Sequence, residues 1–121
     1  MAAIFPRTLP NRGEIWTVQL MGIGHEQQGL RPVLIISEDA LNHSGFGLVI
    51  ALPLTSNTSQ RSRSRVLVNP PEGGLTAPSA IMCEQILRLD AEQRLIKRLG
   101  KVSGQTLYQI SLRLAIILGI E

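Results

Sequence analysis

Short apolar runs dominate the first hundred residues, and their spacing predicts strands. Residues 14–20 alternate, with Trp16, Val18 and Leu20 on one face, which is the period of a half-buried strand. Residues 33–36 and 48–54 are continuous apolar runs rich in β-branched side chains, and at this length they favour buried strands. Residues 66–68 and 80–82 have the character of further short strands, bounded by turn signals at 69–71 and 73–74.

The period changes after residue 100, where the pattern predicts one long helix. Ser103 can cap this helix and Gly119 can end it; its apolar positions recur at spacings of three and four, at Leu107, Ile110, Leu114 and Ile117. Residues 37–42 can form a single helical turn with Ser37 as its N-cap.

These elements predict a mainly β fold, a small β-barrel or curled antiparallel sheet with a helix packed across it. The chain of 121 residues is expected to form a single domain. We expect a loose N-terminal arm at 1–10, the β-barrel with its short helix at 11–100, and the C-terminal helix at 103–118.

Composition places the chain among compact proteins of a reducing compartment. Hydrophobic residues make up 44% and charged residues 17%, which argues against global disorder. The apolar runs are shorter than a bilayer requires, so no membrane association is expected. No secretory signal is recognisable and the single cysteine, Cys83, cannot form an internal disulfide, which favours the cytoplasm. Cys83 follows a buried strand pattern, which disfavours a catalytic thiol.

Two surfaces of such a fold need a partner. The edge strands of a small barrel and a mostly apolar C-terminal helix leave surface that a monomer covers poorly. A homodimer would cover it and would bring two copies of any binding groove together.

Charge is unevenly distributed along the chain. No Asp or Glu occurs between Asp39 and Glu72, whereas Arg61, Arg63 and Arg65 lie in that window. Arginine suits phosphate oxygens and a positive surface attracts polyanions. A solvated loop remains the alternative interpretation.

The segment 24–32 predicts a loop that holds a polar ligand. It places His25, Glu26 and Gln27 between two glycines and ends in Arg31 and Pro32. The residue before a proline is biased towards extended backbone, so we expect Arg31 at a rigid junction between this loop and the strand at 33–36.

These side chains suit a reaction in which the substrate supplies its own nucleophile. No metal-ligand spacing, P-loop or nucleophile elbow is present in the sequence, and no metal or cofactor is expected. RNA can be cleaved when its 2′-OH attacks the adjacent phosphate, which requires a base, an acid and donors for the phosphate oxygens. His25 can transfer protons near neutral pH, Arg31 can stabilise charge, and Thr55 and Ser56 offer hydroxyl groups.

The order and spacing of several short motifs resemble the MazF/PemK/Kid toxins of type II toxin–antitoxin systems. The resemblance covers roughly residues 12–119 and includes the sequences RGEIW at 12–16, GHEQQG at 24–29, RPVL at 31–34, PLTS at 53–56, GGL at 73–75, EQI at 84–86 and LD at 89–90.

This resemblance implies a small SH3-like β-barrel of the CcdB/PemK type that forms a homodimer. It also implies a metal-independent endoribonuclease that cuts single-stranded RNA, such as mRNA, at short sequences and leaves 2′,3′-cyclic phosphate and 5′-OH ends. The implied partner is an acidic, partly disordered antitoxin of the MazE/PemI type that competes with RNA. A CcdB-like poison of DNA gyrase and a non-catalytic RNA-binding module are the alternatives.

The resemblance also assigns candidate residues. Arg31 and Thr55 match the catalytic arginine and threonine of the MazF branch, while His25 and Glu84 match the histidine and carboxylate of the PemK/Kid branch. That branch has an arginine two residues before the carboxylate, where this chain has Met82. The residues expected to bind RNA are Glu26, Gln27, Ser56, Asn57, Arg61, Arg63, Arg65 and Gln85.

Structural roles are the alternatives for the same residues. Arg31 could brace the loop through Glu26, and Thr55 could start a turn. His25 could be a solvated loop residue. Glu84 could pair with Arg88 on the surface.

Overall fold

Antiparallel strands form the body of the protein, and one long helix follows them. The computed structural model describes residues 8–20, 29–59 and 62–120. The elements of this part of the chain are β1 (Glu14–Leu20), β2 (Gly29–Ile35), α1 (Asp39–Asn42), β3 (Leu48–Thr55), β4 (Arg65–Val68), the 3-10 helix η1 (Glu72–Gly74), β5 (Ser79–Met82), β6 (Leu87–Asp90), α2 (Ala91–Arg94), β7 (Leu95–Lys101) and α3 (Gly104–Leu118). The predicted mainly β fold with a C-terminal helix is confirmed.

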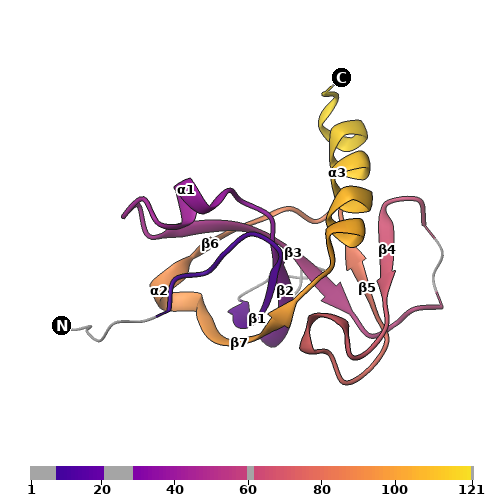
Figure 1. Ribbon diagram of the computed structural model, residues 1–121, viewed down its shortest axis with the longest axis horizontal. Helices are drawn as coiled ribbons and strands as arrows, with labels where there is room; N and C mark the ends of the chain where they lie inside the picture. The colour runs from indigo at the N-terminus through magenta and orange to yellow at the C-terminus, as the bar shows by residue number, and fades with distance from the viewer. Residues whose placement is uncertain (1–7, 21–28, 60–61, 121) are drawn as a thin grey trace.

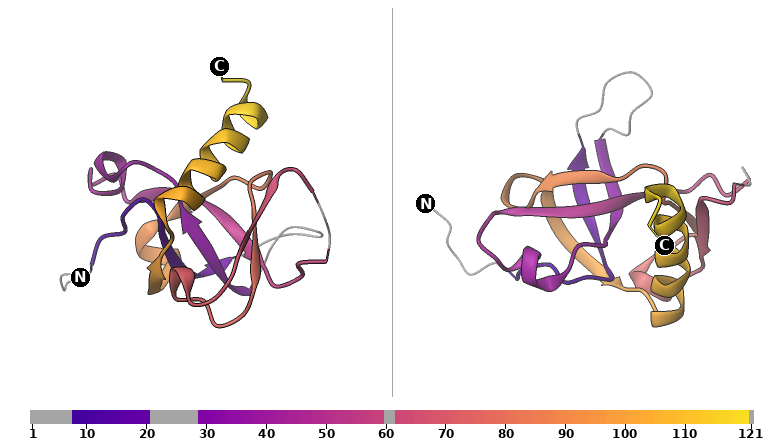
Figure 2. Two further views of the ribbon diagram at one scale, coloured as in Figure 1. Left: turned by 45° about the vertical axis from the view of Figure 1, so that its right-hand side comes forward. Right: turned by 90° about the horizontal axis from the view of Figure 1, so that it is seen from above.

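The strands make one curled sheet that is not closed into a barrel. Their order is β4-β5-β3-β2-β1-β7, and β6 pairs with β3 beside this path. Of the two forms that the pattern allowed, the curled sheet is the one present, because β4 and β7 end the described sheet without pairing with each other. The backbone of η1 packs against β7 instead: a Cβ on Gly74 would lie 1.9 Å from the carbonyl oxygen of Leu99. Figure 2 shows the curled sheet in two further views.

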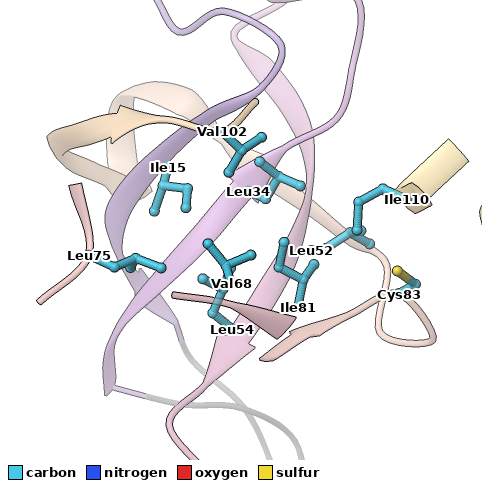
Figure 3. Close-up of a cluster of buried hydrophobic side chains, with 10 residues drawn as sticks. All are labelled: Ile15, Leu34, Leu52, Leu54, Val68, Leu75, Ile81, Cys83, Val102 and Ile110. Atoms are coloured by element: carbon cyan, nitrogen blue, oxygen red, sulfur yellow. The ribbon is translucent and has the colours of Figure 1, made fainter. Parts of the chain in front are cut away.

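Alternation of side chains divides the core between the two faces of the sheet. One cluster includes Ile15, Leu34 and Leu52 and receives Ile110 from α3 (Figure 3). The other cluster includes Trp16, Val18 and Val33 and packs against Leu89 and Leu95. The strands β1 to β3 contribute to both clusters and therefore lie between the two halves of the core.

The C-terminal helix begins and ends as its sequence predicts. The hydroxyl of Ser103 accepts a hydrogen bond from the Thr106 amide at 3.1 Å, and Gly119 ends the helix in the left-handed region at a φ of 69°. Glu72 of η1 accepts from the Ser103 amide at 2.9 Å and from the Thr106 hydroxyl at 2.6 Å. These hydrogen bonds, led by that from the Ser103 backbone, hold the pKa of Glu72 below its usual value.

Two short helices differ from the prediction. The N-cap of α1 is Glu38, so the predicted cap at Ser37 is wrong. Ser37 is buried, and its hydroxyl accepts from the Ile50 amide at 3.0 Å and contacts the side chain of Asn42. The pattern did not predict α2, whose N-cap Asp90 accepts from the amides of the next turn at 2.9 and 3.0 Å. No helix in the described part of the chain combines the length and apolar character needed to span a bilayer.

Candidate functional site

Arg31 lies inside strand β2 rather than at a junction between a loop and the strand. The strand β2 begins at Gly29, and β1 pairs with it from there onwards. The prediction that the strand starts after Pro32 is therefore wrong. The proline is accommodated because the pairing of β2 with β3 starts only at Val33, so only β1 is paired with this part of β2. Arg31 itself is exposed, whereas Val33 on the same face is fully buried.

Arg31 and Thr55 each lie two residues beyond the same end of the β2–β3 ladder. The last pair of this ladder is Val33 opposite Pro53. Side chains two residues apart in a strand project on the same side of the sheet, so Arg31 lies on the side of Val33 and Thr55 on the side of Pro53. By this alternation, the two residues that sequence reasoning ranked highest belong to one face of the sheet.

The Thr55 hydroxyl is oriented by the backbone that follows it. Its oxygen accepts a hydrogen bond from the Asn57 amide at 3.2 Å. A hydroxyl that accepts from the backbone still has its own hydrogen to donate. Asn57 in turn accepts from the amide and hydroxyl of Ser59 at 3.2 and 2.7 Å. Thr55 therefore starts a turn and also keeps a donor for a ligand.

Glu84 is engaged by two residues that lie 19 and 20 positions earlier in the chain. One carboxylate oxygen accepts from the Ser64 hydroxyl at 2.6 Å, and the other accepts from Nη2 of Arg65 at 3.1 Å. The anticipated pairing with Arg88 is not the one that forms. Partial burial acts to raise the pKa of Glu84, but the hydrogen bonds from Ser64 and Arg65 outweigh it and lower the pKa. We call Ser64, Arg65 and Glu84 the Glu84 cluster.

The predicted cationic patch divides into residues with different surroundings. Arg63 is exposed to solvent, whereas the side chain of Arg65 is largely buried in its ion pair with Glu84. Arg61 lies outside the described residues. Ser56 and Asn57 are exposed at the start of the same loop.

Met82 occupies a buried position at the base of the site. It is opposite Arg65 in the pairing of β4 with β5, and its sulfur is 3.6 Å from Nε2 of Gln85. Gln85, a residue that the sequence assigned to RNA, is half-buried.

Four of the residues predicted for the site, Arg61 among them, lie outside the described part of the chain. His25, Glu26 and Gln27 lie outside the described residues, in the segment that joins β1 to β2. Sequence reasoning missed Ser64, because the only signal for it is a contact between segments far apart in the sequence.

The described part of the chain offers neither a metal site nor a reactive thiol. Within residues 8–20, 29–59 and 62–120, no three histidine, cysteine or carboxylate side chains gather as a metal site would require. Cys83 is fully buried, and this burial raises the pKa of its thiol to about 11. A thiol with that pKa supplies almost no nucleophilic thiolate near neutral pH.

Comparison with known proteins decides the family. Residues 11–118 match the family model described as "PemK-like, MazF-like toxin of type II toxin-antitoxin system". The chain belongs to this family. Endoribonuclease PemK of Escherichia coli is a curated relative, 35% identical over 108 residues that cover 88% of this chain and 80% of PemK. The predicted family and enzyme class, endoribonuclease, are confirmed.

Solved structures of PemK/MazF proteins share the fold. MazF from Deinococcus radiodurans superimposes with a TM-score of 0.80 at 25% identity, covering 93% of this chain and 99% of that one. An endoribonuclease from a mycobacterial species, solved in complex with its cognate antitoxin, superimposes with a TM-score of 0.75 at 29% identity and covers 93% and 97% of the two chains. The curled sheet and C-terminal helix are therefore the family's architecture.

Proposed function

We propose that this protein is a toxin that cleaves single-stranded RNA, mRNA included, at short specific sequences without a metal ion. The observation that supports the proposal is that Arg31 and Thr55 each lie two residues beyond the Val33–Pro53 pair and, by strand alternation, on one face of the sheet. Membership of the PemK/MazF family and the curated name of the E. coli relative support the substrate class.

The proposed reaction uses the 2′-OH of the substrate as its nucleophile. The 2′-oxygen bonds to the adjacent phosphorus as the bond from phosphorus to the 5′-oxygen breaks, so the products carry a 2′,3′-cyclic phosphate and a 5′-OH. One group removes the 2′-OH proton and another protonates the leaving 5′-oxygen. We assign one of these proton transfers to His25 on sequence grounds alone.

Arg31 and Thr55 act on the phosphate in this proposal. A guanidinium is a cation with several donors and no acceptor, so the role of Arg31 is to stabilise the negative charge that grows on the equatorial oxygens. The Thr55 hydroxyl, held by the Asn57 amide at 3.2 Å, donates to one of those oxygens. Positioned donors of this kind are typically worth a factor of about 10² to 10³ each in rate.

The polar loop after β3 supplies the RNA-binding surface. Ser56, Asn57 and Arg63 are exposed along it, and they offer hydroxyl, amide and guanidinium groups to phosphates and base edges. Gln85 adds an amide beside the same loop.

We also propose a homodimer held in part by α3. Figure 1 shows the C-terminal half of α3 standing clear of the sheet, and Ile116 on it is 80% exposed, with Tyr108, Leu112 and Leu118 also exposed. An apolar helix face of this kind favours a second copy over solvent. Light scattering after size-exclusion chromatography should give twice the monomer mass; a monomer at micromolar concentration would refute the dimer.

An acidic antitoxin is the proposed protein partner. The mycobacterial endoribonuclease of similar fold was solved with its cognate antitoxin. A disordered acidic segment would imitate the charge of RNA along the exposed Arg63 side of the loop.

The deciding experiment is RNA cleavage in EDTA with a matched pair of arginine variants. The purified protein is incubated with a long single-stranded RNA, and cut sites and end groups are mapped by primer extension and mass spectrometry. Discrete cuts with 2′,3′-cyclic phosphates are expected for the wild type. Arg31→Ala should lower the rate at least about 100-fold, and Arg88→Ala, which removes an exposed arginine from β6, should not.

Two outcomes would contradict the proposal. Intact RNA together with dose-dependent inhibition of gyrase supercoiling would assign the fold to a gyrase poison instead. Intact RNA that is nevertheless bound with strong salt dependence would assign it to a non-catalytic binding module.

A further inference from the structure

The Glu84 cluster joins the end of the polar loop to the end of β5. Ser64 and Arg65 close the loop that begins after Thr55, and Glu84 follows β5 by two residues. The backbone is fixed at the same point, because the Cys83 amide donates to the Ser64 carbonyl at 3.0 Å. The side chains therefore reinforce a junction between two segments that the sheet already aligns.

Both carboxylate oxygens of Glu84 already accept hydrogen bonds. Ser64 donates to Oε1 at 2.6 Å, while Nη2 and Nε of Arg65 lie 3.1 and 3.4 Å from Oε2. The chain of contacts continues into the loop from Ser64, whose hydroxyl is 2.9 Å from that of Ser62. The two side chains that donate to the carboxylate thus both belong to the residues that close the loop.

The opposite end of the loop is held by the candidate catalytic residue. Asn57 donates its amide to Thr55 and accepts from Ser59. Register places Thr55 opposite Ala80, and Met82, two residues further along β5, is opposite Arg65. Thr55 and Arg65 therefore project on the same face, and the loop that carries Arg63 is tied down at both of its ends beside the site.

The hydrogen bonds and the lowered pKa of Glu84 fit a residue that anchors the loop better than one that accepts a proton during catalysis. Against the effect of its partial burial, the bonds from Ser64 and Arg65 hold its pKa below the usual value. A catalytic base works best when its pKa lies near the working pH. Glu84 is therefore a carboxylate whose two oxygens both accept hydrogen bonds and whose affinity for a proton is reduced.

We propose that Glu84 is a positioning residue: by holding Ser64 and Arg65 it fixes the loop that presents Arg63 to the RNA, and it takes no part in proton transfer. The inference rests on the proposed ribonuclease function and assigns a specific task within it. Arg65 becomes a structural partner of the carboxylate in this scheme, and Arg63 becomes the arginine that the RNA meets.

The kinetic test separates KM from kcat in Glu84→Gln, with Glu38→Gln as the matched control. Glu38 is a carboxylate with an 80% exposed side chain at the N-cap of α1. For Glu84→Gln we expect KM to rise about tenfold, with kcat staying within about threefold of the wild type, as for the loss of ground-state binding. The pH profile of kcat should keep its acidic limb, and the control should match the wild type in every parameter.

The inference would be overturned if Glu84→Gln lowered kcat by about 100-fold or more at unchanged KM and abolished the acidic limb, because Glu84 would then be a proton-transfer group. Ser64→Ala provides a second test, because it removes the 2.6 Å hydrogen bond and leaves the ion pair in place. It should raise KM in the same direction as Glu84→Gln; an unchanged KM in this folded variant would likewise refute the anchor.

Limited proteolysis tests the role of Glu84 without relying on RNA cleavage, so it separates this inference from the proposed ribonuclease function. Trypsin cleavage after Arg63 should be faster in Glu84→Gln than in the wild type or in Glu38→Gln, and equal rates would contradict the anchor. Absence of RNA cleavage by the wild type would refute the proposed function, whereas this proteolysis result would still report on the loop.

Discussion

Glu14 and Glu84 are both held by an arginine, but in opposite surroundings. The Glu14 side chain is 6% exposed and its partner Arg98 is 44% exposed, whereas Glu84 is 34% exposed and its partner Arg65 is 15% exposed. Glu14 also accepts from the indole of Trp16 at 3.0 Å and from the Asn11 amide at 2.9 Å. We call Glu14, Trp16 and Arg98 the Glu14 cluster.

The difference in exposure indicates a different role for each carboxylate. The donors to Glu14 come from β1, β7 and the residues just before β1, so its carboxylate satisfies groups that the core would otherwise leave unpaired. The Glu84 carboxylate satisfies the end of an exposed polar loop. We therefore expect changes near Glu14 to affect stability and changes near Glu84 to affect RNA binding.

The largest loss of stability is expected from Gly74→Ala, at the junction of η1 with β7. The new Cβ would lie 1.9 Å from the Leu99 oxygen, and the residue has a φ of 73°. We expect a loss of about 3 kcal/mol or more in the free energy of unfolding, measured by urea denaturation. Gly45→Ala is the control: it has a φ of 92° with no atom within 4 Å of the new Cβ, and it should cost about 1 kcal/mol. Equal losses would show that close packing at η1 does not matter.

The next largest effect is expected from Glu14→Gln. The neutral amide weakens the bond to Nε of Arg98, which lies 2.8 Å from the carboxylate, and it disturbs the bonds to Trp16 and Asn11. We expect a loss of about 2 kcal/mol in urea denaturation, with kcat for RNA cleavage unchanged. A larger loss of stability in Glu84→Gln than in Glu14→Gln would reverse the comparison.

Both carboxylates should contribute to a decline of stability in acid. Burial acts to raise the pKa of Glu14, but the hydrogen bonds from Trp16, Asn11 and Arg98 outweigh it, so the pKa lies below the ordinary value of 4.5. The folded state then binds the proton more weakly than the unfolded state, and stability is lost as the pH falls from about 4.5 through the folded pKa. The stability difference between wild type and Glu14→Gln should shrink over this range in urea titrations, and a constant difference would contradict the assignment.

The smallest change in stability is expected from Arg31→Ala, although it should have the largest effect on cleavage. Arg31 is exposed at the rim of the sheet, and substitutions at such positions usually change the free energy of unfolding by less than about 0.5 kcal/mol. Thermal unfolding of this variant should therefore overlay the wild type. A destabilised variant would indicate that Arg31 braces the fold, the structural role that its sequence also allowed.

The sequence predicted best where the signals are local. The alternation at 14–20 and the helical period with Ser103 and Gly119 at its ends each describe one segment, and the corresponding strand and helix formed as expected. The burial of Trp16 and Cys83 followed from the same patterns.

Local patterns left open what contacts between distant segments decide. The sequence allowed a barrel or a curled sheet, because closure depends on whether β4 and β7 meet, and η1 packs against β7 instead. The partner of Glu84 is Arg65 rather than Arg88 because the register of β4 with β5 brings residues 65 and 82 together. The periodicity of one segment does not show how it pairs with another strand. The sequence therefore indicated which residue types belong to the candidate site, but not how they are arranged.

The way Arg31 and Thr55 are brought together limits how the site can evolve. Their side of the sheet is set by the alternation of β2 and β3 beyond the Val33–Pro53 pair, so inserting or deleting a single residue between that pair and either group would turn one side chain to the opposite face. Substitutions along the strands keep this alternation, and changes of length in the polar loop after Thr55 leave the ladder itself untouched. Natural variants should therefore exchange side chains along these two strands and vary in length beyond them, so that RNA preference can diversify while the two groups keep to one face.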